Sequence, residues 1–328
     1  MQQRRLSGHG PHVSEIEFGG WAIGGGWGEQ SDADSIAALH AALDGGVNFI
    51  DTAEGYGDGR SEQLIADVLK DRPDDVFVAT KTPPDAGPWP PSPHCRWQDR
   101  YSAAYLRANV EQRLQNLNTD RIDLLQLHTW TRAWNDDPQP LLVLRQLREE
   151  GKINLIGVST PEHDQACVIQ LMRDGLVDVV QIIFNLFHQE PASQLLPVAA
   201  ETGTGVIVRV ALDEGSLTGK YSPDHQFPEA DFRSQYFAGD RMARTADRVE
   251  AIRADLEDFG LADQYSLADL SLKFALSPPE VSTVIVGMRN EDQARMNTRT
   301  ARLRDLPDEL IKRLHRHNWL RGVWYSGK

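Results

Sequence analysis

Short apolar segments alternate with longer amphipathic segments along most of this 328-residue chain. Continuous apolar runs are typical of strands buried on both faces, and apolar residues spaced three and four apart are typical of helices. Eight runs are expected to be strands: 18–23, 47–50, 76–81, 122–128, 153–159, 179–185, 205–210 and 282–287. Eight repeats of strand then helix predict an α/β fold, a (β/α)8 TIM barrel, in a single domain over residues 1–328.

The helices expected between and after these strands carry polar residues at their starts, and several end near glycine. They cover residues 31–46, 61–71, 102–118, 140–152, 164–175, 194–203, 266–276 and 291–303. Three further features are expected around the barrel. A short N-terminal hairpin within 3–17 would close its bottom, and a Pro-rich loop at 83–97 and a long segment at 212–265 would lie at the C-terminal face, where loops this long are usually functional.

Composition narrows the functional classes. The net charge of −14 argues against a nucleic-acid surface, and no run approaches the length of a membrane span. Two cysteines, Cys95 and Cys167, are too few for a disulfide framework. With no signal peptide at the start, the expected protein is cytoplasmic, without membrane or nucleic-acid partners. No metal site is expected, and an oligomer is neither indicated nor excluded.

Four polar residues lie at or just after the ends of three consecutive expected strands. Asp51 follows the second strand, Tyr56 lies in the loop after it, Lys81 ends the third strand and His128 ends the fourth. Because the C-terminal ends of barrel strands converge on one site, these side chains are expected to meet. A carboxylate, a phenol, an amine and an imidazole make a chemically coherent set.

Each member of the set has a physical role. An ammonium near a phenol favours the phenolate, so Lys81 is expected to lower the pKa of Tyr56. Lys81 would lose its own proton in an apolar pocket unless an anion held it, and Asp51 supplies that anion. His128 can orient a substrate oxygen. Such a group suits proton transfer to a carbonyl oxygen while another group delivers hydride.

The chain also resembles a known family. "GVNFIDTAEGYGDGRSE", "ATKT", "RIDLLQLH", "EEGKINLIGVS", "VQIIFNLF" and "LDEGSLTGKY", in this order, are similar to the motifs of the aldo-keto reductase superfamily. The resemblance covers about residues 12 to 300 and is closest to the bacterial branch. It implies NADPH-dependent reduction of an aldehyde or ketone, or the reverse oxidation, on a small-molecule substrate such as a sugar or ring ketone. It also implies that Asp51, Tyr56, Lys81 and His128 are the catalytic tetrad, with Tyr56 as general acid/base.

The resemblance further implies a cofactor site built from four regions. Gly20 and Trp21 match the pattern beside the nicotinamide, and Ser159 and Gln181 match the pair that binds its carboxamide. The loop over the pyrophosphate and the adenosine site complete the set: Arg209, Val210, Leu212, Gly215, Leu217, Gly219, Lys220, Gly287, Arg289, Gln293 and Asn297. Arg289 could pair with a 2′-phosphate in a bidentate manner, which favours NADP over NAD.

Three positions depart from the common family pattern. Gly20 replaces a threonine, and Thr160 stands where many members have asparagine. Arg209 replaces an aromatic ring that stacks on the nicotinamide, although a planar guanidinium can also stack. Trp21 and Trp130, near the expected mouth, are the substrate-contact candidates, because aromatic side chains suit flat or apolar substrate faces.

Two other functions stay open at this point. A barrel with the same residues could bind NADP as a regulatory subunit with little turnover. A glycosidase could use paired carboxylates such as Asp51 and Glu54, but that reading leaves Lys81 and the glycine-containing loop 212–220 unexplained.

Overall fold

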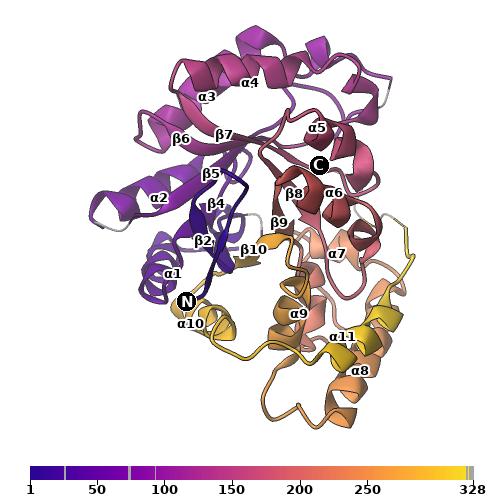
Figure 1. The fold of residues 1–328 in the computed structure, drawn as a ribbon. Helices are drawn as coiled ribbons and strands as arrows, with labels where there is room; N and C mark the ends of the chain where they lie inside the picture. Colours follow the sequence, from indigo (N-terminus) through magenta and orange to yellow (C-terminus); the bar gives the residue numbers. More distant parts are fainter. Residues whose placement is uncertain (26, 73–74, 93, 323, 325–328) are drawn as a thin grey trace.

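The computed structural model describes residues 1–25, 27–72, 75–92, 94–322 and 324. Eight parallel strands close into a barrel in the order β10–β3–β4–β5–β6–β7–β8–β9, surrounded by helices (Figure 1). The strands are β3 (Ile16–Gly19), β4 (Phe49–Asp51), β5 (Phe77–Thr82), β6 (Ile122–Leu127), β7 (Ile153–Ser159), β8 (Val179–Ile183), β9 (Gly205–Arg209) and β10 (Val281–Gly287). The predicted TIM barrel is confirmed.

Helices follow the strands as the apolar spacing predicts. They are α1 (Asp32–Asp44), α2 (Arg60–Lys70), α3 (Ala103–Asn116), α4 (Gln139–Glu149), α5 (Ile169–Arg173), α6 (Leu195–Thr202), α9 (Leu267–Ala275) and α10 (Glu291–Thr300), with α11 (Asp308–Leu314) beyond. Ser31, Ser102, Ser266 and Asn290 cap their helices, each side chain accepting a backbone N–H three residues on. No helix in the described ranges is long and apolar enough to cross a membrane.

Apolar side chains form the floor of the barrel, and an N-terminal hairpin covers them. Strands β1 (Gln3–Arg5) and β2 (His12–Ser14) pair antiparallel, as expected, and form the indigo hairpin of Figure 1. The hairpin is bound to the barrel end through Ser282 Oγ, which donates to the Leu6 carbonyl at 2.9 Å. One cluster joins hairpin and strands: Leu6, Val13, Phe49, Ala79, Leu124, Leu155, Val179 and Ile207.

Polar side chains form the next layer of the barrel interior. Side chains alternate between the two faces of a strand, so residues two positions after the floor residues also point inward. Asp51 follows Phe49, Lys81 follows Ala79, Gln126 follows Leu124, Gln181 follows Val179 and Arg209 follows Ile207 at this spacing. The alternation of β-strands therefore places a charged layer directly above an apolar one.

Two sequence-based expectations about local structure need correction. The first barrel strand ends at Gly19 rather than continuing to residue 23, because Trp21 takes an α conformation and Ala22–Gly24 form a 3-10 helix. The segment 212–265 is not mainly loop. It contains α7 (Arg233–Tyr236) and the 18-residue α8 (Arg241–Asp258), whose apolar residues are buried against the core.

The contact between hairpin and barrel can be tested at Gly205. A Cβ at this position would overlap the carbonyl oxygen of Leu6, so Gly205→Ala must displace the hairpin or β9. We expect the free energy of unfolding to fall by about 1–3 kcal/mol, the usual cost of overpacking, measured by urea denaturation.

Gly8→Ala is the matched control, because a Cβ there would lie at an ordinary 3.5 Å from the Gly203 carbonyl oxygen. Equal stability of the two variants would contradict tight packing between hairpin and barrel.

Candidate active site

Lys81 lies at the centre of the charged layer and contacts both predicted partners. Its Nζ donates to Asp51 Oδ1, to the Thr52 carbonyl at 2.9 Å and to the Tyr56 hydroxyl at 3.3 Å. Lys81 is fully buried and the Asp51 side chain is 2% exposed. Strands β4 and β5 pair with Asp51 opposite Ala79, and the Lys81 side chain, two residues further along β5, reaches the Asp51 carboxylate. The structure thus brings together Asp51, Tyr56 and Lys81 as the sequence predicts.

The second oxygen of Asp51 is bound by two amides. Gln181 Nε2 donates to Asp51 Oδ2 at 2.8 Å, and Gln126 Nε2 donates to the same atom at 3.3 Å. The carboxylate is therefore bonded on both oxygens, which fixes its orientation toward Lys81. Sequence analysis did not identify Gln126, although an amide at an inward position of the apolar strand 122–128 is a usable signal.

Burial and neighbouring charges act in opposite directions on the pKa values of Lys81 and Tyr56. Burial opposes the charge on Lys81, but Asp51 and then Tyr56 outweigh it, so the pKa of Lys81 rises above its usual value. Burial also raises the pKa of Tyr56, and this effect exceeds the lowering by Lys81. The expected lowering of the Tyr56 pKa is wrong for the protein alone, because desolvation of the phenolate outweighs the attraction of one ammonium.

His128 completes the group at the end of β6. Its backbone N–H donates to the Thr82 carbonyl at 2.8 Å. Its ring centre lies 6.0 Å from that of Tyr56, and the Trp89 ring packs edge-on against it at 5.0 Å. The Pro-rich loop after β5 therefore contributes an indole directly beside the imidazole.

The two substrate-contact candidates lie in different environments. The Trp21 ring stacks against Tyr56 with centres 6.3 Å apart and lies 4.9 Å from Phe232. Trp130 is instead 1% exposed, belongs to the hydrophobic core, and donates its indole N–H to Asn135. The structure brings Trp21 to the tetrad and does not bring Trp130 there.

Glu54, two residues before Tyr56, is bound to helix α3. Its Oε2 accepts a hydrogen bond from Asn109 Nδ2 at 2.7 Å and lies 3.0 Å from Arg113 Nη1. Asp51 is paired with Lys81 on another side. Each carboxylate thus has its own cationic partner, an arrangement that does not suit the paired acid and base of a glycosidase.

The residues predicted beside the nicotinamide line the same interior. Ser159 Oγ donates to Gln181 Oε1 at 3.4 Å, and Arg209 Nη2 donates to the Thr160 carbonyl at 3.1 Å. The Nε of Arg209 is buried without a hydrogen-bond partner in the described part of the chain. This guanidinium is therefore only partly satisfied by the protein itself.

Packing explains why residue 20 is glycine. A Cβ at Gly20 would lie 2.7 Å from Ser61 Oγ and 2.8 Å from the Asp51 carbonyl oxygen. Ser61 donates to the Gly20 carbonyl at 2.9 Å. The hydroxyl of Ser61 thus occupies the space that a side chain at residue 20 would need.

The loop after β9 holds the next group of predicted cofactor residues. Val210, Asp213, Glu214 and Gly215 all have positive φ, at 58°, 46°, 55° and 91°. Of the residues predicted to contact the cofactor here, Leu217 is 1% exposed and packs in the core. Lys220 is exposed, and its Nζ lies beside the Tyr221 ring. Gly219, at φ 70°, lies against Leu267 of α9.

The residues predicted at the adenosine end meet at the start of α10. Gln293 Oε1 accepts the backbone N–H of Arg289 at 2.9 Å, and Asn297 Nδ2 donates to the Gly287 carbonyl at 3.5 Å. The Arg289 guanidinium reaches across to the loop after β3, donating to Gln30 Oε1 at 2.9 Å.

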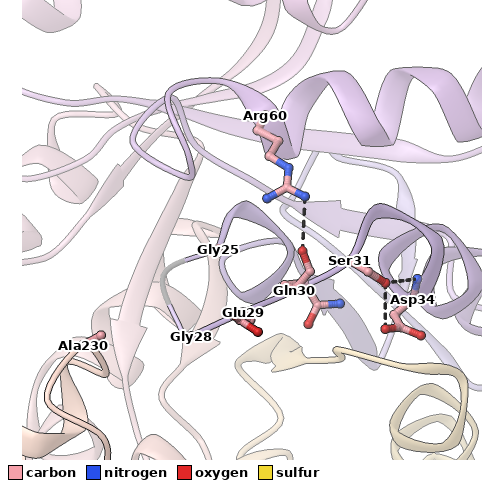
Figure 2. Close-up of a pocket in the computed structure, with 8 residues that line it drawn as sticks. All are labelled: Gly25, Gly28, Glu29, Gln30, Ser31, Asp34, Arg60 and Ala230. Carbon is pink, nitrogen blue, oxygen red and sulfur yellow. Dashed lines mark hydrogen bonds between the residues drawn. The ribbon is translucent and has the colours of Figure 1, made fainter.

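A hollow of about 840 Å³ lies beside this region, next to the loop after β3 (Figure 2). Arg60 donates to the Gln30 carbonyl at 3.2 Å on its wall. Its lining residues are Gly25, Gly28, Glu29, Gln30, Ser31, Asp34, Arg60 and Ala230. It shares three of them with a hollow of about 320 Å³ that Arg289 and Tyr221 also line. The hollows therefore adjoin the predicted adenosine end rather than the tetrad.

Residues 15–318 match the aldo/keto reductase family. Together with the barrel and the group of Asp51, Tyr56, Lys81 and His128 at the C-terminal ends of its strands, this match shows that the chain belongs to that family. The sequence-based resemblance is confirmed.

Individual relatives agree with this assignment over nearly their full lengths. The chain is 31% identical to Aldo-keto reductase YhdN of Bacillus subtilis (strain 168), covering 91% of this chain and 93% of that protein. It is 27% identical to the NADH-specific methylglyoxal reductase of Escherichia coli (strain K12), covering 87% and 89%. Among solved structures, a glycerol dehydrogenase from Gluconobacter oxydans is similar at a TM-score of 0.78, with 27% identity and 99% of both chains covered.

One buried acid near the tetrad was missed in the sequence. Glu17 of β3 is fully buried, and neither carboxylate oxygen has a hydrogen-bond partner among the described residues. Burial and then repulsion by Asp51 raise the pKa of Glu17 well above its ordinary value. Alternation along residues 16–19 could have indicated that this acid points inward.

Glu214 makes the stability of the protein depend on pH. Burial, with the adjacent charge of Asp213, raises its pKa to about 8. The folded protein then keeps a proton that the unfolded chain releases above about pH 4.5. The contribution of Glu214 to the free energy of unfolding is therefore fully present below about pH 4.5 and is lost as the pH rises to about 8.

We expect Glu214→Gln to reduce the loss of unfolding free energy between pH 5 and pH 8 by on the order of 2 kcal/mol. Urea denaturation across this range measures it. Glu229→Gln, at an exposed position, is the control and should follow the wild-type curve. Parallel curves for wild type and Glu214→Gln would show that Glu214 titrates normally.

Proposed function

We propose that this protein is an NADP-dependent oxidoreductase that interconverts an aldehyde or ketone with an alcohol by direct hydride transfer, with Tyr56 as general acid/base. The observation that carries this proposal is the position of Lys81 Nζ, which touches both the buried carboxylate of Asp51 and the hydroxyl of Tyr56. Family membership supports the reaction class, and this geometry supports Tyr56 as the proton donor.

The chain's own residues account for the proton. A carbonyl oxygen placed against Tyr56 and His128 would receive the phenolic proton of Tyr56 during reduction. Lys81, held charged by Asp51, would stabilise the phenolate that this transfer leaves. Because burial raises the pKa of Tyr56, the phenol stays protonated at neutral pH and serves as the acid for reduction. In the oxidation direction the same atoms act in reverse.

The residues around the tetrad fit a nicotinamide dinucleotide. Gly287 has open space around its Cα, since a Cβ there would meet no atom within 4 Å. The partly satisfied guanidinium of Arg209 faces the same interior and could stack on the nicotinamide. When bound, the reduced nicotinamide supplies the hydride. Ser159 and Gln181 would orient its carboxamide, and the loop after β9 would hold the pyrophosphate.

The preference for NADP rests on Arg289. Its guanidinium is planar and can bind two phosphate oxygens at once. The bonds to Gln30 and to the Glu29 carbonyl pre-orient it beside the hollow lined by Tyr221. Because a relative is named NADH-specific, family membership alone does not imply this preference.

Tyr56→Phe tests the proton donor. We expect turnover to fall at least about 100-fold, the usual range for a lost general acid, while cofactor affinity stays close to wild type. Oxidation of NADPH, followed by absorbance with a panel of aldehydes, ring ketones and sugars, measures turnover. Binding is measured separately by titration.

Tyr105→Phe is the matched control, since its hydroxyl donates only to the Pro83 carbonyl outside the tetrad. Wild-type turnover by Tyr56→Phe would rule out the assigned acid. Tight NADP binding with no substrate-dependent change in absorbance over the whole panel would instead favour the regulatory barrel.

Arg289→Ala tests the cofactor preference. We expect kcat/KM for NADPH to fall about tenfold or more, as for loss of a charged hydrogen-bonded pair, with little change for NADH. Arg295→Ala is the control, because Arg295 is an exposed arginine on α10, the helix that follows Arg289, and pairs with Glu291. Equal losses with both cofactors would place Arg289 away from the 2′-phosphate.

A further inference from the structure

The loop after β9 has a backbone conformation that requires outside support. Three of its residues other than glycine, Val210, Asp213 and Glu214, have positive φ. Such conformations cost roughly 1–2 kcal/mol each for ordinary residues. They persist only where surrounding contacts over-determine the backbone. The contacts that hold this loop therefore decide its conformation.

Asp213 is the main anchor of the loop. Its side chain is fully buried, and it accepts hydrogen bonds from Ser216 Oγ at 2.7 Å and from the Tyr236 hydroxyl at 3.3 Å. A buried carboxylate also needs a cation, and the cation comes from the C-terminal segment. Arg321 Nη1 donates to Asp213 Oδ2 at 3.0 Å, and Nη2 donates to Oδ1 in a bidentate pair.

Arg321 is itself held in a cage of aromatic rings. Its guanidinium carbon lies 4.6 Å from the Trp324 ring centre, 5.5 Å from that of Trp319 and 5.7 Å from that of Phe187. Nη2 also donates to the Tyr236 hydroxyl at 2.8 Å. Only 7% of its side chain is exposed. These contacts hold the guanidinium in the orientation in which it binds Asp213.

The C-terminal segment is bound to the barrel independently of this pair. The backbone N–H of Trp319 donates to the Phe187 carbonyl at 2.8 Å, and Asn318 Oδ1 accepts a hydrogen bond from the backbone N–H of Gln189 at 3.1 Å. Both partners lie in the connection after β8. On the other flank of the loop, Asn185 Nδ2 donates to the Val210 carbonyl at 2.8 Å. The loop is thus held between the β8 connection and the C-terminal segment.

We propose that Arg321 is a positioning residue for the cofactor: through Asp213 it holds the loop after β9 in the strained conformation that receives the dinucleotide pyrophosphate. This inference rests on the proposed nicotinamide-dependent function. Arg321 acts only through Asp213, and its pair neutralises a carboxylate that would otherwise repel the pyrophosphate. Loss of Arg321 therefore weakens cofactor binding and leaves the tetrad intact.

The test compares Arg321→Met, which keeps bulk within the aromatic cage, with Arg321→Lys, which keeps the charge but loses the bidentate geometry. For Arg321→Met we expect the Kd for NADPH to rise about tenfold or more, as for loss of a charged hydrogen bond. Arg321→Lys should lie between this variant and wild type. With saturating cofactor, kcat should change less than about threefold, since the transition-state contacts stay in place.

Hydrogen exchange gives a readout without cofactor. Amides of residues 210–219 should exchange faster in Arg321→Met, while those of β4 and β5 should not change. Arg302→Met, at an exposed arginine after α10, is the matched control and should match wild type in both measurements. Should Arg321→Met fail to fold, Asp213→Asn tests the same pair with little change in shape.

Unchanged Kd and loop exchange in Arg321→Met would overturn the proposal. Faster exchange across the whole barrel, with kcat falling as much as affinity, would also overturn it by showing a general structural role. If the wild-type protein bound neither NADPH nor NADH, the proposed function would be refuted. If the wild-type protein bound NADPH and Arg321→Met bound it equally well, only the role of Arg321 would be refuted.

Discussion

The buried ion pair between Lys81 and Asp51 is the interaction on which the site depends. Two charges removed from water are costly unless each is paired and hydrogen-bonded, and removing one leaves the other uncompensated. Here Asp51 also accepts hydrogen bonds from the side-chain amides of Gln126 and Gln181, which fix the carboxylate. The Lys81 ammonium donates to this carboxylate, to the Thr52 carbonyl and to the Tyr56 hydroxyl. The fold must therefore hold strands β4, β5, β6 and β8 in the correct register for the Lys81 ammonium to contact the Tyr56 hydroxyl.

The barrel satisfies this requirement by separating apolar and polar layers. Below the pair, the floor cluster joins the strands to Leu6 and Val13 of the hairpin, so the charged layer rests on a closed apolar base. Above it, the Trp21 ring packs on Tyr56 and on Phe232, and the Trp89 ring packs on His128. Desolvation raises the pKa of Tyr56, so the phenol is protonated at neutral pH, as its proposed role as proton donor requires.

The proposed cofactor groove is built differently, from segments far apart in the chain. Arg289 at the start of α10 is tied to the loop after β3, and Arg233 of α7 lies over the Trp27 ring of that same loop, 4.5 Å from its centre. Arg321 in the C-terminal segment holds Asp213 after β9. The two regions are thus anchored separately: Asp51, Tyr56 and Lys81 meet inside the barrel, whereas the loops around the proposed groove are each held by their own long-range contacts.

The sequence alone predicts the barrel, seven of its strands to within two residues, and the meeting of Asp51, Tyr56, Lys81 and His128, because side-chain alternation and the succession of strands and helices can be read along the chain. Tertiary structure decided the rest. The sign of the Tyr56 pKa shift depends on how completely the phenol is desolvated, and Trp130 lies in the core through packing that no short motif records. Glycine at residue 20 follows from Ser61 on another segment, and Asp213 meets Arg321 across 108 residues. Such contacts join segments that lie far apart in the chain, so no local pattern specifies which side chains meet.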